Sequence, residues 1–371
     1  MNAIFLEPLD VLFLRGNKLF GDPGSFGESL IPPWPSVAAG AIRSRMLVDE
    51  GVDLAAFARG EVEHPTLGTP AKPGPFAVTA FHLARRRADG TVAMLVQPPA
   101  DLVIGEDDAG KPHAHRLTPT QAAGLQSSAP LPLLPVLAET TRSKPANGYW
   151  LTQDGWRDYL NGKTPQPAHL VKSGALWQID SRVGVGLDAA TGSVAEGRLF
   201  SVQAVALRSG VGFLAAVTGA VPPSEGAVRL GGDGRGASIQ AVNAGLPEPD
   251  YAALAKARRC RLILTTPGIF PAGWRLPGMN VEGVFTLNGV KGRVVCAAVP
   301  RAEVVSGWDL ARWQPKPAQR AAPAGSVYWL QDLDTTPEAL RKLADTGLWG
   351  AGCEDAARRA EGFNRIILAH Y

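Results

Sequence analysis

The residues of this chain best suited to bind an anion form a glycine-rich stretch, Gly231-Gly-Asp-Gly-Arg-Gly236, called the glycine loop below. Glycines let a backbone turn sharply, and without Cβ atoms consecutive N–H groups can converge on an anion. Arg235 adds a permanent cation whose forked donors suit a phosphate. We therefore interpret Gly231, Gly232, Gly234, Arg235 and Gly236 as a phosphate-binding loop. The simpler alternative is a glycine-rich hairpin turn that carries one solvated arginine.

A second stretch, from Arg15 to Arg43, carries Lys18, Phe20 and Trp34 in a loop that leads into a predicted helix. We expect this helix over 37–48, with Ser36 as its N-cap and Gly51 just beyond its end. Free N–H groups and the helix dipole attract phosphate to such an N-terminus. Arg15, Lys18, Ser36 and Arg43 are therefore candidate RNA-binding residues.

A third stretch, 171–200, alternates in a strand–turn–strand pattern that predicts a projecting β-hairpin around Arg182 and Arg198. Single-stranded RNA is bound by arginines on phosphates and by aromatic rings on bases, and Trp177 is such a ring. Taken singly, however, Phe20, Trp34 and Trp177 are more typical of core packing.

Signatures of catalysis are absent from the sequence. Gly184-Val-Gly-Leu-Asp-Ala189 matches a dinucleotide-binding pattern, but the residues 190–193 that follow would break the required helix. His113-Ala-His115 follows a proline in a predicted loop, and no third ligand is visible, so a solvated pair is favoured over a metal site. We expect no catalytic residue, no metal and no cofactor, and hence a protein that is not an enzyme.

Composition favours a globular protein of two domains. Among 371 residues, 45% are hydrophobic, 42 are glycine and 31 are proline, which predicts many turns and short strands. No apolar run is long enough to span a membrane, and three widely separated cysteines fit a reducing cytoplasm. Net charge is only +3, but residues 250–320 hold eleven lysines and arginines against four acids. This excess favours a face for a polyanion, or, for the run at 258–261, a solvated helix end.

Hydrophobic periodicity predicts two units of similar order. In residues 1–245 we expect strands at 3–6 and 238–243, a hairpin at 76–84 and 91–96, a second hairpin at 199–207 and 212–217, and a short helical segment near 223–229. Residues 246–371 predict strands at 261–266, 293–299, 326–330 and 364–369 with a helix at 337–346. Residues 105–170 show few regular patterns. The interpretation is an α+β fold of two ferredoxin-like domains, 1–245 and 246–371, with loop-rich and β-hairpin insertions at about 100–200.

Four stretches together resemble one family: "PLDVLFLRGNKLFG", "PPWPSVAAGAIRSRM", "RVGVGLDAATGSVAEGRLFSVQAVAL" and "LGGDGRGASI". They are similar to the third subunit of the Cmr-type (type III-B) CRISPR effector complex, a protein of the RAMP superfamily. The likeness covers most of the first 245 residues and continues more weakly in "PAGSVYWL" and "EGFNRIIL". Each motif is weak alone, but their order and spacing are fairly specific.

The resemblance implies a non-catalytic, RNA-binding role in antiviral defence. Such subunits hold the five-prime tag of the crRNA beside the large polymerase-like subunit and the first backbone RAMP subunit, away from any membrane. By position, the glycine loop would be the family's glycine-rich loop, Ser36 and Arg43 would lie on a phosphate-facing helix, and residues 182–200 would be a thumb-like hairpin that contacts and kinks the RNA. Residues 100–170 have no counterpart that we can place.

Three alternatives remain at this point. The nearest is the equivalent tag-binding subunit of another type III complex. A RAMP-fold crRNA-processing endoribonuclease would be an enzyme, but a histidine near the first helix would favour it and residues 1–63 contain none. The third alternative is a single-strand RNA-binding module outside CRISPR.

Overall fold

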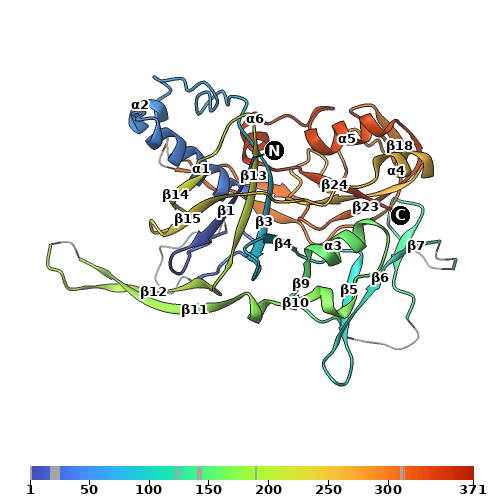
Figure 1. The fold of residues 1–371 in the computed structure, drawn as a ribbon, viewed down its shortest axis with the longest axis horizontal. Coiled ribbons are helices and arrows are strands. Elements are labelled where there is room, and N and C mark those ends of the chain that lie inside the picture. Colours follow the sequence, from blue (N-terminus) through green and yellow to red (C-terminus); the bar gives the residue numbers. More distant parts are fainter. Residues whose placement is uncertain are drawn as a thin grey trace.

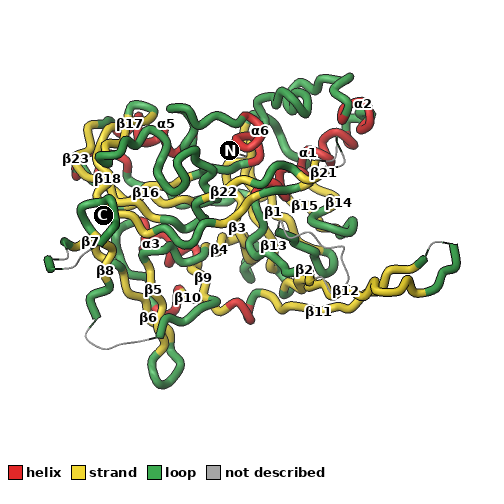
Figure 2. Tube along the Cα trace, turned by 180° about the vertical axis from the view of Figure 1, so that it is seen from behind, coloured by secondary structure: helices red, strands yellow, loops and turns green. Residues whose placement is uncertain are grey.

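This protein is described by a computed structural model over residues 2–16, 26–121, 123–124, 127–139, 144–188, 190–309, 312 and 314–371. For 26–27 and 195–198 only the backbone is described. Two antiparallel sheets form the body, and a long β-hairpin projects from it (Figure 1). Strands and loops greatly outweigh helices (Figure 2). Among the helices of the described residues, none combines the length and apolar character needed to cross a bilayer.

The first sheet has eight strands in the order β10-β9-β4-β3-β13-β1-β15-β14. Their bounds are β1 Asn2–Pro8, β3 Ala77–Arg86, β4 Val92–Val96, β9 Tyr149–Thr152, β10 Leu170–Lys172, β13 Val211–Thr218, β14 Glu225–Arg229 and β15 Gly236–Val242. Helix α1 (Pro35–Asp49) packs Ala38 and Ile42 into the core on one face of this sheet. The predicted helix at 37–48, the hairpin at 76–96 and the strand at 238–243 are confirmed.

The second sheet has five strands in the order β17-β18-β23-β16-β24. These are β16 Cys260–Leu264, β17 Val284–Leu287, β18 Val290–Ala298, β23 Val327–Asp334 and β24 Ile366–Ala369. Helix α5 (Pro337–Thr346) packs on this sheet with α4 (Tyr251–Ala257) beside it, whereas α6 (Ala356–Glu361) contacts α1 and β3 of the first sheet. The predicted helix at 337–346 is confirmed with its bounds, because Thr336 caps it through the Ala339 N–H and Pro337 occupies its first turn.

Smaller elements surround the two sheets. They are β5 Leu102–Glu106 with β6 Pro112–Arg116, β7 Thr118–Thr120 with β8 Leu134–Val136, β19 Glu303–Val305 with β22 Gln319–Ala321, β20 Trp308–Asp309 with β21 Gln314–Pro315, the helices α2 Leu54–Ala58 and α3 Gln153–Leu160, and single 3-10 turns at Pro167–His169 and Ser173–Ala175. The projecting hairpin consists of β11 Trp177–Leu187 and β12 Val194–Leu207, and β2 Phe26–Gly27 pairs with its base in parallel.

Alternation along the strands divides the apolar side chains among three main cores. Ile4 and Leu6 of β1 face the core under α1, whereas Phe5 between them faces the opposite side of the first sheet. In β16, Leu262 and Leu264 face the core under α4 and α5, whereas Ile263 packs in the same core as Phe5. Because side chains alternate across a strand, the second faces of both sheets meet in this shared core. The two halves of the chain therefore fold as one packed body.

Two sequence predictions in the first half are wrong. The segment near 223–229 is not helical: residues 225–229 form strand β14, because they pair with β15 from Glu225–Gln240 to Arg229–Gly236, and Gly226 has φ +102°. The predicted hairpin of 199–207 with 212–217 does not form either. Strand β12 pairs with β11 from Leu207–Trp177 outward, whereas β13 lies between β1 and β3. Pairing of β12 with the long strand β11 is thus favoured over the hairpin that the short turn at 209–210 predicts.

Residues 105–170 are more regular than the sequence predicts. They include β9 and β10, which extend the first sheet at its edge, and helix α3, whose Trp156 and Tyr159 are fully buried. The sequence does contain a signal for the start of α3, because Thr152 is an N-cap that accepts from the Gly155 N–H. The surrounding prolines obscured it.

A fully buried ion pair joins the insertion at about 100–200 to the second sheet. Arg261 of β16 has no solvent-exposed surface, and its Nη1 lies 2.7 Å from Asp101 Oδ2, which is equally buried. Arg261 also donates to the carbonyls of Tyr159 (2.8 Å) and His370 (2.7 Å), while the Tyr159 hydroxyl donates to Asp101 Oδ1 (2.5 Å). The sequence interpretation of 258–261 as a polyanion face or a solvated helix end is therefore wrong for Arg261, although Arg258 and Arg259 are exposed.

We predict that Asp101→Asn destabilises the fold by about 3–5 kcal/mol, because it leaves the Arg261 charge buried without a counter-charge. Tyr159→Phe removes one hydrogen bond to the same carboxylate and should cost about 1–3 kcal/mol. Urea unfolding of the purified protein measures both. Glu248→Gln is the control: it breaks an exposed pair with Arg341 (3.2 Å) and should change stability by less than about 1 kcal/mol. Equal effects of Asp101→Asn and Glu248→Gln would contradict the role assigned to the buried pair.

Candidate RNA interface

One extended segment, residues 10–15, joins the projecting hairpin to the glycine loop. Leu12 exchanges two backbone hydrogen bonds with Val205 at the base of β12, at 2.9 and 2.8 Å. The next residue, Phe13, accepts from the Gly232 N–H at 2.8 Å. The structure therefore brings Arg15, the glycine loop and the hairpin base together, although they are far apart in sequence.

The glycine loop is the turn between β14 and β15, and its glycines have different roles. A Cβ on Gly231, at φ +78°, would lie 2.8 Å from the Phe13 carbonyl oxygen, so glycine there permits the close approach of residues 10–15. Gly234, at φ +63°, has open space where its Cβ would stand. The Gly232 N–H, which we expected to face an anion, is instead bonded to Phe13. The exposed end of the loop is thus formed by Asp233 and Gly234.

Both arginines at this junction are paired with carboxylates. Arg235 Nη1 lies 2.7 Å from Asp10 Oδ2, and its guanidinium sits 5.1 Å from the centroid of the Phe13 ring. Arg15 Nη2 lies 3.5 Å from Asp233 Oδ1. The Asp10 and Asp233 side chains are 60% and 52% exposed, so both pairs are open to solvent and each is worth at most about 1 kcal/mol.

The projecting hairpin has an apolar outer part. Val185 stands opposite Leu199 and Leu187 opposite Val194, and all four side chains are exposed. On the other face, the Phe200 ring lies over Gly184, where any side chain would collide with it. Nearer the base, Arg182 pairs with Asp180 two residues away (Nη2–Oδ2 2.8 Å).

Two predicted site residues cannot be placed. Lys18 falls within 17–25, outside the described residues, as does Phe20. Arg198 lies on β12, but its side chain is outside the description.

Helix α1 does not join this cluster. In Figures 1 and 2 it lies on the other side of β14 and β15 from the hairpin. Arg43 stacks on Phe76 with 5.0 Å to the ring centroid, and burial lowers the pKa of its guanidinium, an effect partly offset by the charge of Glu361. The residue of α1 that reaches β14 is Arg45, which donates to the Ala227 carbonyl at 2.7 Å.

Ser36 is not the N-cap of α1, contrary to the sequence prediction. The helix begins at Pro35, its N-cap position is Trp34, and no side chain caps it. The residue before a proline is held in the extended region, so the helix starts at the proline itself.

The tryptophans of the predicted RNA stretches belong to cores. Trp34 is buried in the core under α4 and α5, and its indole N–H donates to Glu303 at 3.5 Å. Trp177 packs edge-on against Trp150 with 5.4 Å between ring centroids. The core-packing alternative is therefore confirmed for both.

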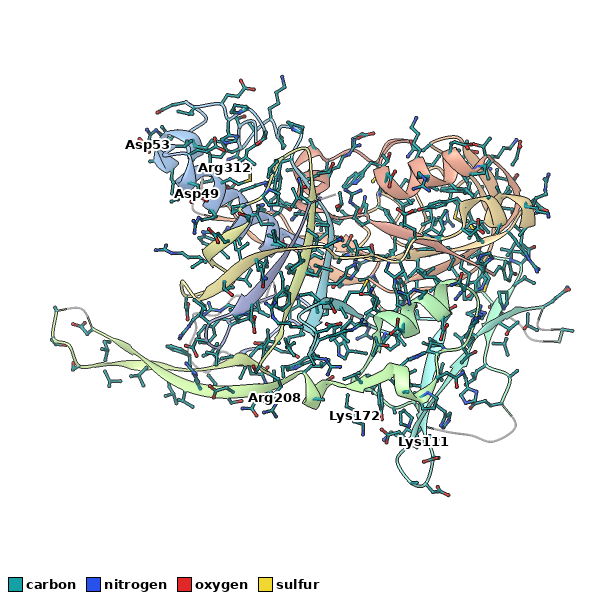
Figure 3. The ribbon with its side chains drawn as sticks, viewed as in Figure 1. Asp49, Asp53, Lys111, Lys172, Arg208 and Arg312 are labelled. Carbon is teal, nitrogen blue, oxygen red and sulfur yellow. The ribbon has the colours of Figure 1, made fainter. Side chains whose placement is uncertain are left out.

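Sequence reasoning missed several residues of the interface. Phe13, Asp10 and Asp233 hold the two arginines in place. The continuous apolar run at 11–14 was a signal for Phe13 alone, and neither aspartate had one. Exposed Arg208 and Lys172 continue from the hairpin base along one edge of the molecule toward Lys111 (Figure 3). Lys172 lies 2.8 Å from Glu106.

Comparison with known proteins identifies the family. The sequence model of the family "CRISPR-associated protein (Cas_Cmr3)" matches residues 4–370, so this chain belongs to that family. Among curated proteins, no sequence matches this chain.

Solved structures show a more distant likeness. A chain in the cryo-EM structure of the Type III-B Cmr-beta bound to cognate target RNA is 14% identical over 88% of this chain and 86% of its own, with a TM-score of 0.46. A chain of the same complex bound to cognate target RNA and AMPPnP, state 1, is 12% identical over 98% and 95%, at 0.48. A chain of the Csm3-Csm4 subcomplex of the type III-A interference complex is 10% identical over 91% and 99%, at 0.38. At these scores the family assignment rests on the sequence match.

We predict that Gly231→Ala lowers the melting temperature, because its Cβ meets the Phe13 carbonyl at positive φ. Gly234→Ala should cost only the ~1 kcal/mol of a left-handed alanine and should reduce RNA retention more than stability. Melting temperature and bound RNA are measured on the same preparations. Gly90→Ala is matched to Gly234→Ala, with φ +82° and open space at the tip of β3–β4. If Gly234→Ala lost stability and RNA in proportion, the loop would be only a turn.

Proposed function

We propose that this protein is a non-catalytic RNA-binding subunit of a type III-B CRISPR-Cas effector complex and that it holds the five-prime tag of the crRNA. Membership of the Cas_Cmr3 family carries this proposal. In it, the subunit caps the complex beside the large polymerase-like subunit and contacts the backbone RAMP subunit. The strand orders β15-β1-β13-β3 and β24-β16-β23-β18 support two ferredoxin-like units, since in each the first strand lies between the third and the fourth.

The junction of residues 10–15, the glycine loop and the hairpin base is the proposed RNA-binding surface. Its arginines are held by exposed carboxylates, and exposed pairs contribute little to stability. A phosphate can therefore replace Asp10 beside Arg235, or Asp233 beside Arg15, at small cost to the protein. The exposed apolar side chains of β11 and β12 supply a surface against which nucleobases can lie.

The endoribonuclease alternative would require an accessible general base. The two histidines closest to the first helix in sequence are His64 and His82, and each packs against other parts of the fold. His64 is buried and lies 2.9 Å from Glu50. His82 lines a cavity of about 40 Å³ between the two sheets, too small for a nucleotide, and burial lowers its pKa to about 4. These observations favour a subunit that binds RNA without cutting it.

We predict that Asp10→Asn and Asp233→Asn each strengthen RNA binding several-fold at low salt, because each removes a negative charge that competes with phosphate. Asparagine tolerates the φ of +55° at position 233. Asp49→Asn is the control: it removes the same charge from an exposed pair on α1, with Arg45 at 2.6 Å. Filter binding of a crRNA against salt concentration measures the effect. Equal strengthening by Asp49→Asn would mean that only net charge matters.

Arg235→Ala should weaken binding and reduce the slope of log K against log[salt] by about one, similarly for any guide sequence. Lys342→Ala, which removes an exposed charge from α5, is the charge-matched control. The same titration tests the assignment of Arg43 from the family resemblance. An unchanged slope in Arg43→Ala would remove that residue from the surface, and an unchanged slope in Arg235→Ala would place the surface elsewhere.

We predict that precursor crRNA stays intact on incubation with the purified protein, with or without divalent metal. Denaturing gel electrophoresis follows the RNA, and His82→Ala should behave as the unmodified chain does. Specific cleavage that disappears with one histidine substitution would instead establish a processing nuclease. Co-purification of a crRNA of defined five-prime end with a large polymerase-like subunit would separately test the proposed partners.

A further inference from the structure

A cluster of metal-ligating side chains lies in the insertion, away from the proposed RNA surface. It consists of His113 and His115 on β6 and of Glu139, which follows β8. One ligand atom from each residue lies within 4.8 Å of the others. The His115 Nε2 to Glu139 Oε1 distance is 3.1 Å, and the two imidazole rings meet edge to face at 4.9 Å between centroids.

Two premises of the sequence argument against a metal at this position differ from the structure. The histidines are on a strand, not in a loop, because Pro112–Arg116 pairs with β5 in register from Glu106–Pro112 to Leu102–Arg116. Residues i and i+2 of a strand share a face, which places both imidazoles on one side. The third ligand, absent from local sequence, is Glu139, 24 positions beyond His115.

A glycine on the neighbouring strand leaves room for the imidazole ring of His113. Gly105 stands directly opposite His113 in the β5–β6 register, and any Cβ there would overlap the imidazole. The glycine has no positive φ to account for it. An alanine would be compatible with the backbone but not with this position of the ring.

We propose that His113, His115 and Glu139 bind one divalent transition-metal ion, with Zn²⁺ the best match. Two imidazoles and one carboxylate form a ligand set typical of zinc, with a fourth position left for water. Bond lengths of about 2.0–2.1 Å in a tetrahedral site separate the ligand atoms by roughly 3.3 Å. The His115–Glu139 pair, at 3.1 Å, already has this spacing. The His113 ligand atom lies within 4.8 Å of the other two and would have to move closer when the ion binds.

The ion would fasten two parts of the insertion to each other. The β5–β6 hairpin supplies both histidines, and the segment after β8 supplies the glutamate. That second segment is anchored to the second sheet, because the Leu133 N–H donates to the Val295 carbonyl at 3.0 Å. Metal binding therefore ties the hairpin to the body of the protein, and its effect is structural.

Zinc titration of the tag-free, EDTA-dialysed full chain tests the proposal. We expect one equivalent of Zn²⁺ by calorimetry, and the visible absorption bands of a four-coordinate ion when Co²⁺ is used instead. His113→Ala and His115→Ala should each weaken Zn²⁺ binding beyond the roughly 10–100-fold loss that outer-shell substitutions cause. Glu139→Gln and Gly105→Ala should weaken it at least about tenfold. Amide exchange of β6 should slow when Zn²⁺ is added.

The matched control is His169→Ala. His169 Nδ1 lies 3.3 Å from Asp158 Oδ2, a histidine–carboxylate pair that is not part of a three-ligand group in the described residues. This variant should bind Zn²⁺ as the unmodified chain does. Circular dichroism without metal shows whether each variant is folded. Absence of Zn²⁺ binding in the unmodified chain, or equal losses in His169→Ala and His115→Ala, would overturn the proposal.

Discussion

The buried charge of Arg261 constrains how three distant parts of the chain fold together. A guanidinium without solvent contact is tolerated only when its charge and its donors are satisfied, and three parts of the chain supply the partners. Asp101 comes from the start of the insertion, the Tyr159 carbonyl from α3, and the His370 carbonyl from the residue that follows β24. The insertion must therefore fold against the second sheet. Because β9 and β10 belong to this insertion, its position then fixes that edge of the first sheet.

This shared packing determines how the proposed RNA-binding surface is built. One face of each sheet is buried in the shared core, so these faces cannot contact a ligand. Other elements must therefore form the proposed surface. Residues 10–15 run from the end of β1 to the hairpin base, and Phe13 links them to the glycine loop through a hydrogen bond and a stacked arginine. The contacts that fix the shape of this surface are thus made by backbone and by the Phe13 ring, whereas its arginines are paired with exposed carboxylates. Gly231 permits the close backbone packing against Phe13, and Arg235 carries one of the paired charges.

Local patterns predicted most of the framework. Strands β1, β3, β4, β15, β16, β18, β23 and β24 and helices α1 and α5 were recognisable from alternation, caps and prolines. The errors share a cause. Whether 225–229 becomes a strand depends on β15, and whether β12 pairs with β13 or β11 depends on a partner beyond the turn. In the site, the sequence indicated the glycine loop and the hairpin, but it could not show that Asp10 and Asp233 pair with the arginines. Those contacts join residues more than 200 positions apart.

Arg259 and Arg261 show what a local reading of charge omits. They are two residues apart, yet Arg259 is exposed and stacks on Tyr371 at 5.2 Å, whereas Arg261 is completely buried. Arg261 lies inside a five-residue strand in which every position is buried. A strand that reads Cys-Arg-Leu-Ile-Leu between two partner strands leaves its arginine no route to water, so a buried counter-charge is required elsewhere in the chain. The same reasoning applies to the glutamate beside the two histidines of β6, because a side chain whose partner is distant in sequence can be assigned a role only when the fold brings them together.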